Sequence, residues 1–179
     1  MPIAERAVLL DPMSVLPHMN LGIINYLAGD LTAAEARFRR VLEMQPEFLR
    51  GHTFLGSVLS LQERHDDAIR TLEWLVERGK RAPIYVWTLG IAYALAGRLD
   101  EAHVILDPIN RSSLPALYRA MGYEALGERA SVVPTLERAL EERSDWMYSL
   151  GTQPLMRTLH GDPDFEAVVA KLGLPAAES

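Results

Sequence analysis

Residues 86–106 read VWTLGIAYALAGRLDEAHVIL, and the pattern in this stretch recurs twice toward the N-terminus at one spacing. The Leu-Gly pair at positions 89–90 is also present at 55–56 and at 21–22, in steps of 34 residues. Two further columns keep the same step, an alanine column and a large apolar column: Ala34, Ala68 and Ala102, and Phe38, Leu72 and Leu106. Because three columns share one period, the chain is predicted to consist of tandem structural repeats.

Within each repeat the apolar residues follow helical spacing rather than alternation. The first repeat carries its apolar residues at positions that share one helix face, namely Leu16, Met19, Ile23, Tyr26 and Leu27. Gly29-Asp30 then provides a residue suited to a left-handed turn and an N-cap, and the turn site recurs at Glu63 and Gly97. A second apolar face begins at Ala34, so each repeat is predicted to be helix–turn–helix.

A fourth copy follows after a shorter step. Tyr123, Gly127 and Leu136 echo residues of the third copy at a distance of 30 residues. Asp107-Pro108 falls where the second helix of the third repeat should still run, and proline removes a backbone donor there. We therefore expect that helix to end near Leu106.

The repeats resemble the tetratricopeptide repeat family over about residues 1 to 143. In the third copy the family's pattern is carried by Val86, Leu89-Gly90, Tyr93, Ala102 and Leu106. The resemblance implies an all-α fold, a right-handed α-solenoid of about four helix–turn–helix repeats. Their expected bounds are 15–48, 49–82, 83–112 and 113–143.

Both ends of the chain differ from a full repeat. Residues 1–12 are expected to be a partial repeat or capping helix, because Ala4, Ala7 and Asp11-Pro12 resemble the end of a second helix. Residues 144–179 are expected to be a C-terminal helical cap, in which Asp162-Pro163 starts a helix that ends at Gly173. This closing segment also resembles the end of repeat regions in bacterial signalling proteins such as class III cyclases, Ser/Thr kinases and winged-helix regulators.

Composition narrows the function classes. The chain has 179 residues, a formal net charge of −6 and no cysteine. An acidic chain without a basic face is not expected to bind nucleic acid, and the lack of cysteine excludes disulfides and thiolate chemistry. The N-terminus does not resemble a signal peptide, and no apolar window is long enough to span a membrane. We therefore expect a cytoplasmic protein, and the resemblance of the closing segment implies a bacterial one.

No arrangement of residues indicates catalysis, so no enzyme activity, cofactor or metal is expected. His18 and His52 occupy equivalent repeat positions and are expected to pack, with a metal or pH-sensitive site as the alternative. The segment His65-Asp66-Asp67 is expected to cap a helix rather than hold a cation. The basic cluster at residues 78–81 is expected to complement a helix C-terminus, with phosphate or acidic-peptide binding as the alternative.

In a solenoid of the resembled family the first helices line a concave groove, where partners bind. Projecting the inward face of these helices predicts a mostly apolar groove with these residues: Leu16, Met19, Asn20, Ile23, Tyr26, Arg50, Thr53, Ser57, Ile84, Trp87, Ile91, Leu117 and Met121. The carboxylate clamp of some family members is not expected, because only Arg50 and Asn20 offer suitable side chains. The remaining tryptophans, Trp74 and Trp146, are expected to pack between helices.

The predicted function is a protein–protein interaction module, a scaffold or adaptor that binds an apolar peptide or an amphipathic helix in its groove. Two other roles for the apolar groove stay open: self-association into a homo-oligomer, and filling by the C-terminal cap. The alternative function is a regulatory or sensor region of a bacterial signalling enzyme or transcription regulator. The partner's identity does not follow from the residues.

Overall fold

The computed structural model describes residue 6 and residues 9–110, 114–144 and 147–173. All regular structure in these residues is helical, as the repeat pattern predicts. The elements are α2 (Val15–Ala28), α3 (Leu31–Met44), α4 (Leu49–Leu61), α5 (His65–Arg78), α6 (Pro83–Leu95), α7 (Leu99–Asn110), α8 (Ala116–Ala125), α9 (Arg129–Glu141), the 3-10 helices η1 (Met147–Thr152) and η2 (Pro154–Leu159), and α10 (Pro163–Lys171).

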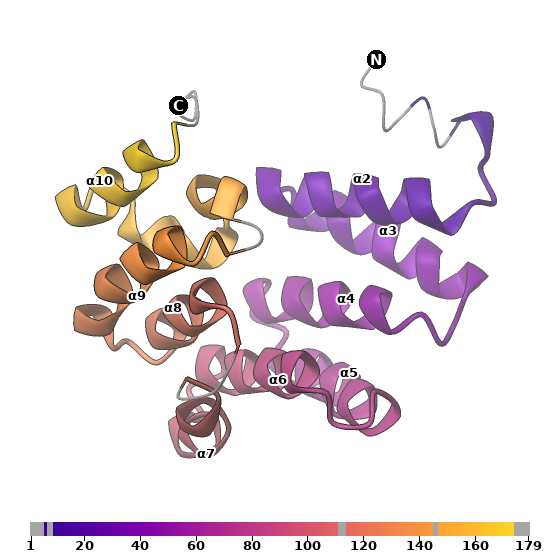
Figure 1. Ribbon diagram of the computed structural model, residues 1–179. Helices are drawn as coiled ribbons and strands as arrows, with labels where there is room; N and C mark the ends of the chain where they lie inside the picture. The colour runs from indigo at the N-terminus through magenta and orange to yellow at the C-terminus, as the bar shows by residue number, and fades with distance from the viewer. Residues whose placement is uncertain (1–5, 7–8, 111–113, 145–146, 174–179) are drawn as a thin grey trace.

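Consecutive helices pack as pairs, and the pairs stack along a curved path (Figure 1). The first helix of each pair also contacts the first helix of the next, so α2, α4, α6 and α8 form the inner layer. The path curves far enough to bring the 3-10 segment beside the C-terminal end of α2 (Figure 1). None of the helices in the described part of the chain combines the length and apolar character needed to cross a bilayer.

The two helices of a pair approach closely at the repeated glycines. A Cβ atom placed on Gly22 would lie 2.5 Å from the ring of Phe38, and one on Gly56 would lie 2.5 Å from Leu72. Since real Cβ atoms do not come so near, only glycine lets the large residue of the second helix sit against the first helix. The 34-residue spacing of Leu-Gly and Phe/Leu is therefore the signature of this contact.

The turn inside each repeat has the same backbone conformation. Gly29, Gly97 and Gly127 have left-handed φ angles of 84°, 72° and 75°, and Glu63 takes this position in the second repeat with a φ of 62°. Asp30 then caps α3, because its carboxylate accepts a hydrogen bond of 2.9 Å from the backbone N–H of Ala33.

The prediction that the helix of the third repeat ends near Leu106 is wrong. α7 continues to Asn110, with Pro108 inside its last turn. Proline costs one backbone hydrogen bond there, while Leu106 and Ile109 remain buried on either side of it. The shorter spacing between the third and fourth repeats arises instead from α8, which has 10 residues where α6 has 13. Pro115 directly precedes α8 and disfavours helical backbone at residue 114, so the helix begins late.

The equivalent histidines hold each first helix to the loop before it. His18 Nε2 donates a hydrogen bond of 3.1 Å to the carbonyl oxygen of Pro12, and His52 Nε2 donates one of 2.7 Å to that of Pro46. The two bonds span the same six positions of sequence. These hydrogen bonds favour the prediction that both histidines have a structural role over the alternative of a metal or pH-sensitive site.

Of the N-terminal segment 1–12 the structure describes residue 6 and residues 9–12, of which 6, 9 and 10 are helical. At the other end the cap joins the main core, where Leu150, Met156 and Phe165 are buried. Asp162 caps α10 by accepting hydrogen bonds from the backbone N–H groups of residues 164 and 165.

Candidate functional site: a cavity on the concave side

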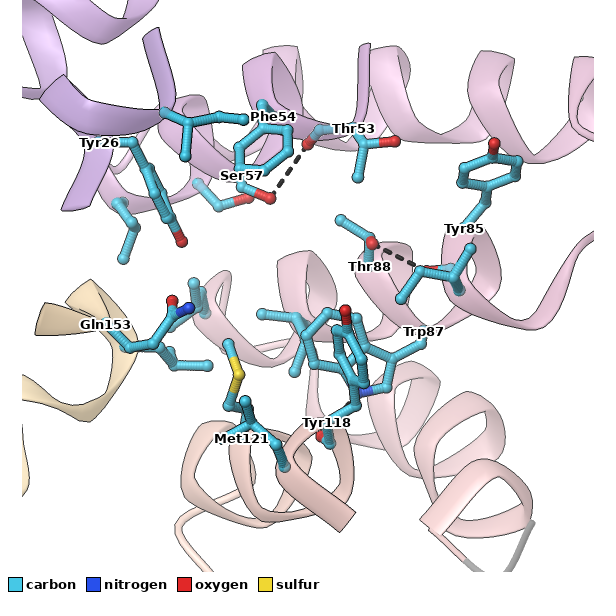
Figure 2. Close-up of a pocket in the computed structure, with 18 of the residues that line it drawn as sticks. Tyr26, Thr53, Phe54, Ser57, Tyr85, Trp87, Thr88, Tyr118, Met121 and Gln153 are labelled. Atoms are coloured by element: carbon cyan, nitrogen blue, oxygen red, sulfur yellow. Dashed lines mark hydrogen bonds between the residues drawn. The ribbon is translucent and has the colours of Figure 1, made fainter. Parts of the chain in front are cut away.

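A cavity of about 420 Å³ lies on the concave side of the stacked repeats. Each of the four first helices contributes to it, and so do residues of the 3-10 segment at its edge (Figure 2). The lining residues are Ile23, Tyr26, Leu27, Arg50, Thr53, Phe54, Ser57, Ser60, Leu61, Ile84, Tyr85, Trp87, Thr88, Ile91, Leu95, Leu117, Tyr118, Met121, Gln153 and Leu155.

Most of the predicted groove residues line this cavity. They are Ile23, Tyr26, Arg50, Thr53, Ser57, Ile84, Trp87, Ile91, Leu117 and Met121. Three predicted residues do not. Met19 is 0% exposed, in the core of the first two repeats, whereas Leu16, which is 62% exposed, and Asn20 lie outside the lining.

Sequence projection missed several aromatic residues of the lining. Phe54, Tyr85 and Tyr118 each directly follow a predicted groove residue, so the inward face is one position wider than a single helical row. An aromatic residue immediately after a groove position is the signal that could have found them. Gln153 and Leu155 lie outside the repeat period and carry no such signal.

The serine and threonine hydroxyls of the lining donate to carbonyl groups of their own helices. Thr53, Ser57, Ser60 and Thr88 each donate to the carbonyl oxygen four residues earlier, at 2.8–3.0 Å. Two of these bonds are visible in Figure 2. The second repeat, which reads as polar in sequence, therefore offers a bound molecule few free donors.

Trp87 connects the third and fourth repeats. Its indole Nε1 donates a hydrogen bond of 3.0 Å to the carbonyl oxygen of Tyr118, and the two rings meet edge to face with centroids 5.2 Å apart. Because Trp87 is only 6% exposed, it supports the cavity wall as much as it lines it. A charged substitution at Trp87 would disturb the fold as well as the cavity.

Among the described residues of the lining, Arg50 is the only Lys, Arg, Asp or Glu. Its guanidinium lies 5.9 Å from the centroid of the Phe54 ring, and no carboxylate of the described residues forms an ion pair with it. Burial raises the pKa of Tyr26 to about 12, against the opposing effect of the positive charge of Arg157. Tyr26 is therefore a neutral hydroxyl group, and it points toward Gln153 (Figure 2).

The cap closes one side of the cavity without filling it. Arg157 Nη2 donates a hydrogen bond of 3.2 Å to the carbonyl oxygen of Leu27, and Thr158 donates to Glu124 of α8. The segment thus bridges the first and fourth repeats. The C-terminal cap, which was one of the predicted occupants of the groove, therefore covers only this edge of the cavity.

In each of the other two polar clusters, one side chain has a structural partner. Asp67 pairs with Arg64 at 2.9 Å and also with Arg70, and the hydrogen bond from Arg64 holds the pKa of Asp67 below its usual value. Within the basic cluster, Arg78 pairs with Glu47 at 2.8 Å.

Trp74 packs against His52, with ring centroids 4.1 Å apart, as expected of a residue between helices. The other tryptophan for which packing is predicted, Trp146, lies outside the described residues.

The repeat geometry defines an α-solenoid of helix–turn–helix units with a concave cavity. The sequence model of the tetratricopeptide repeat family matches residues 28–70 and 55–103. The match identifies residues 28–103 as tetratricopeptide repeats, and the fold supports the tetratricopeptide repeat assignment by continuing the same helix–turn–helix architecture on both sides of them.

Two solved structures share the fold. The first, TTC0263, is a thermophilic tetratricopeptide repeat protein of Thermus thermophilus, with 22% identity, a TM-score of 0.60, and coverage of 88% of this chain and 89% of that one. The second is YrrB, described as a tetratricopeptide repeat protein with an unusual peptide-binding site, with 13% identity, a TM-score of 0.54, and coverage of 95% and 90%. No curated protein matches the chain.

Proposed function

We propose that the chain is a protein-interaction module that binds an apolar segment of a partner protein in the concave cavity. The observation that carries this proposal is the cavity itself, which all four first helices line with mainly aliphatic and aromatic side chains. Aromatic residues in such a recess are the usual anchors of protein interfaces. The peptide-binding site named for YrrB supports the proposal by likeness of fold.

An amphipathic helix fits the cavity better than an extended peptide. An extended peptide needs donors and acceptors for its backbone, and the hydroxyls of Thr53, Ser57 and Thr88 already donate to their own helices. A helix satisfies its own backbone and presents only side chains. We therefore expect two or three apolar side chains of a partner helix to enter the cavity.

The experiment compares a cavity variant with a matched variant on the outer layer. Ser57 is half-buried in the lining, whereas Ser131 is half-buried on α9 and outside the lining. Wild type, Ser57→Glu and Ser131→Glu are used as baits in source-cell lysate, and bound proteins are identified by mass spectrometry. A synthetic peptide from any captured protein is then titrated, with circular dichroism to follow helix formation.

A partner retained by Ser131→Glu, lost with Ser57→Glu and helical when bound would support the proposal. Capture that Ser57→Glu leaves unchanged would overturn it, as would a peptide that binds without gaining helix. Circular dichroism of each bait establishes that the variants fold.

Self-association is a second candidate, favoured by a separate surface. Leu9, Leu10, Met13 and Leu16 are all more than half exposed at the N-terminal end of the described chain. Large apolar side chains exposed this close together in the sequence favour burial in a subunit interface. Light scattering should then show a mass that falls with Leu10→Glu but not with Val104→Glu, an equally exposed apolar position on α7. A monomeric mass for wild type would rule it out.

A further inference from the structure

We propose that the cavity also binds a small amphiphile, a monocarboxylate with an aliphatic or aromatic body, whose carboxylate pairs with Arg50. This binding does not require the protein partner proposed above. The chemistry and the orientation of this ligand follow from three features of the cavity: its size, the different character of its two ends, and its small number of free hydrogen-bond donors.

The size of the cavity suits a small molecule. Its volume of about 420 Å³ lies within the range of roughly 300–1,000 Å³ typical of small-molecule sites. The lining runs along α4 from Arg50 to Leu61, about 16 Å at 1.5 Å per residue. A slender molecule of this length could lie parallel to the first helices.

One end of the cavity is lined mainly by leucine side chains, with the hydroxyl of Tyr26 and the amide of Gln153 as the polar groups near the cap. Leu27, Leu61 and Leu95 occupy the same position of three successive repeats, at the C-terminal ends of the parallel helices α2, α4 and α6. Leu155 of the cap joins this end. Buried apolar surface of this kind favours the hydrocarbon body of a ligand.

The opposite end carries the charge. Arg50 is near the N-terminus of α4, and Tyr85 lines the cavity near the N-terminus of α6. The guanidinium of Arg50 has no ion-pair partner among the described residues, and helix N-termini add partial positive charge. An arginine that faces a recess without a carboxylate partner is well suited to a ligand carboxylate.

The shortage of donors indicates that the body between these ends is hydrocarbon. Because the hydroxyls of Thr53, Ser57 and Thr88 donate to their own helices, a polar group buried beside them would find few free donors. An acyl chain or aromatic ring has no such groups. The aromatic residues Phe54 and Trp87 would contact it directly.

The test compares probes that share a body but differ in charge. Potassium decanoate and decanol are titrated separately into the full chain by isothermal calorimetry, below the concentrations at which they aggregate, with acetate as the probe without a body. We expect decanoate to bind at least about tenfold more tightly than decanol, because one charge-assisted pair distinguishes them, and acetate not to bind.

Three variants locate the site. Arg50→Met should abolish the preference for decanoate over decanol, whereas Arg138→Met, an exposed arginine of α9 away from the cavity, should preserve it. Ser57→Leu projects into the cavity and should weaken both probes. The proposal is overturned if decanoate does not bind to wild type, if it binds no better than decanol, or if Arg50→Met keeps the preference.

Discussion

The guanidinium of Arg157 donates a hydrogen bond to the carbonyl oxygen of Leu27, 130 positions earlier in the chain. The same guanidinium occupies the space where a Cβ atom of residue 29 would stand. This contact links the cap to the first repeat, so the curvature of the whole solenoid depends partly on it. Substitutions at Gly29 and Gly97 allow the contribution of this contact to stability to be measured.

Gly29→Ala should destabilise the protein more than Gly97→Ala. Both glycines have left-handed φ angles, so each substitution is expected to cost about 1 kcal/mol of backbone strain. Only at Gly29 does the new Cβ also displace Arg157, whereas at Gly97 it meets nothing within 4 Å. The displaced hydrogen bond adds about 1 kcal/mol, measurable by urea unfolding.

Arg157→Ala provides the control for that comparison. In its background the two alanine variants should lose equal free energy of unfolding, because the contact that distinguishes them is absent. A difference that persists in the Arg157→Ala background would show that the cap contact is not its cause.

Glu63→Gly should stabilise the protein. Glu63 occupies the turn position that is glycine in the other repeats, with a φ of 62°, and its side chain is exposed. Removing the left-handed strain should raise the free energy of unfolding by up to about 1 kcal/mol, because the greater freedom of glycine in the unfolded chain offsets part of the relieved strain. Glu63→Ala retains the strain and should have almost no effect, so equal stabilisation by both variants would contradict this explanation.

Trp87→Phe should destabilise the protein more than Trp74→Phe. Trp87 is almost fully buried and donates to the carbonyl oxygen of Tyr118, so the change removes a hydrogen bond and leaves a small void between α6 and α8. The expected loss is about 2 kcal/mol in thermal or urea unfolding. Trp74 is half-buried, and its substitution should cost clearly less. Equal losses would mean that the bond to Tyr118 contributes nothing.

The repeat architecture could be predicted because it depends on local rules that recur. The contact of Gly22 with Phe38 requires one small and one large residue at a constant offset, and that offset is visible as a 34-residue period. The closure of the cavity could not be predicted in the same way. Leu155 reaches it from the 3-10 helix η2 and Gln153 from the residue before that helix, and this segment has no counterpart in the repeats.

Errors in the predicted site have a similar origin. Phe54 lines the cavity beside Thr53 because the inward face of α4 includes the position next to the projected row. Met19 holds the repeat position of Thr53 but is buried in the core of the first two repeats. Projection of a single helical row cannot predict these differences, because they depend on which side chains the neighbouring repeat buries.

Tyr26 predicts how stability changes at alkaline pH. Burial raises its pKa in the folded protein to about 12, from 10.0 in an exposed tyrosine. Below pH 10 both folded and unfolded chains keep the proton, so the hydroxyl causes no pH dependence. Between about pH 10 and 12 the unfolded state loses its proton first, so stability falls as pH rises, by up to about 3 kcal/mol.

Urea unfolding at about pH 8, 10 and 11 measures this effect when wild type is compared with Tyr26→Phe. The variant lacks the titrating group, so its free energy of unfolding should fall less steeply with pH, because only the other titrating groups remain. Tyr148→Phe, at a position that is 62% exposed, should keep the slope of wild type. If Tyr26→Phe and wild type lose stability in parallel, the hydroxyl is not held neutral by burial.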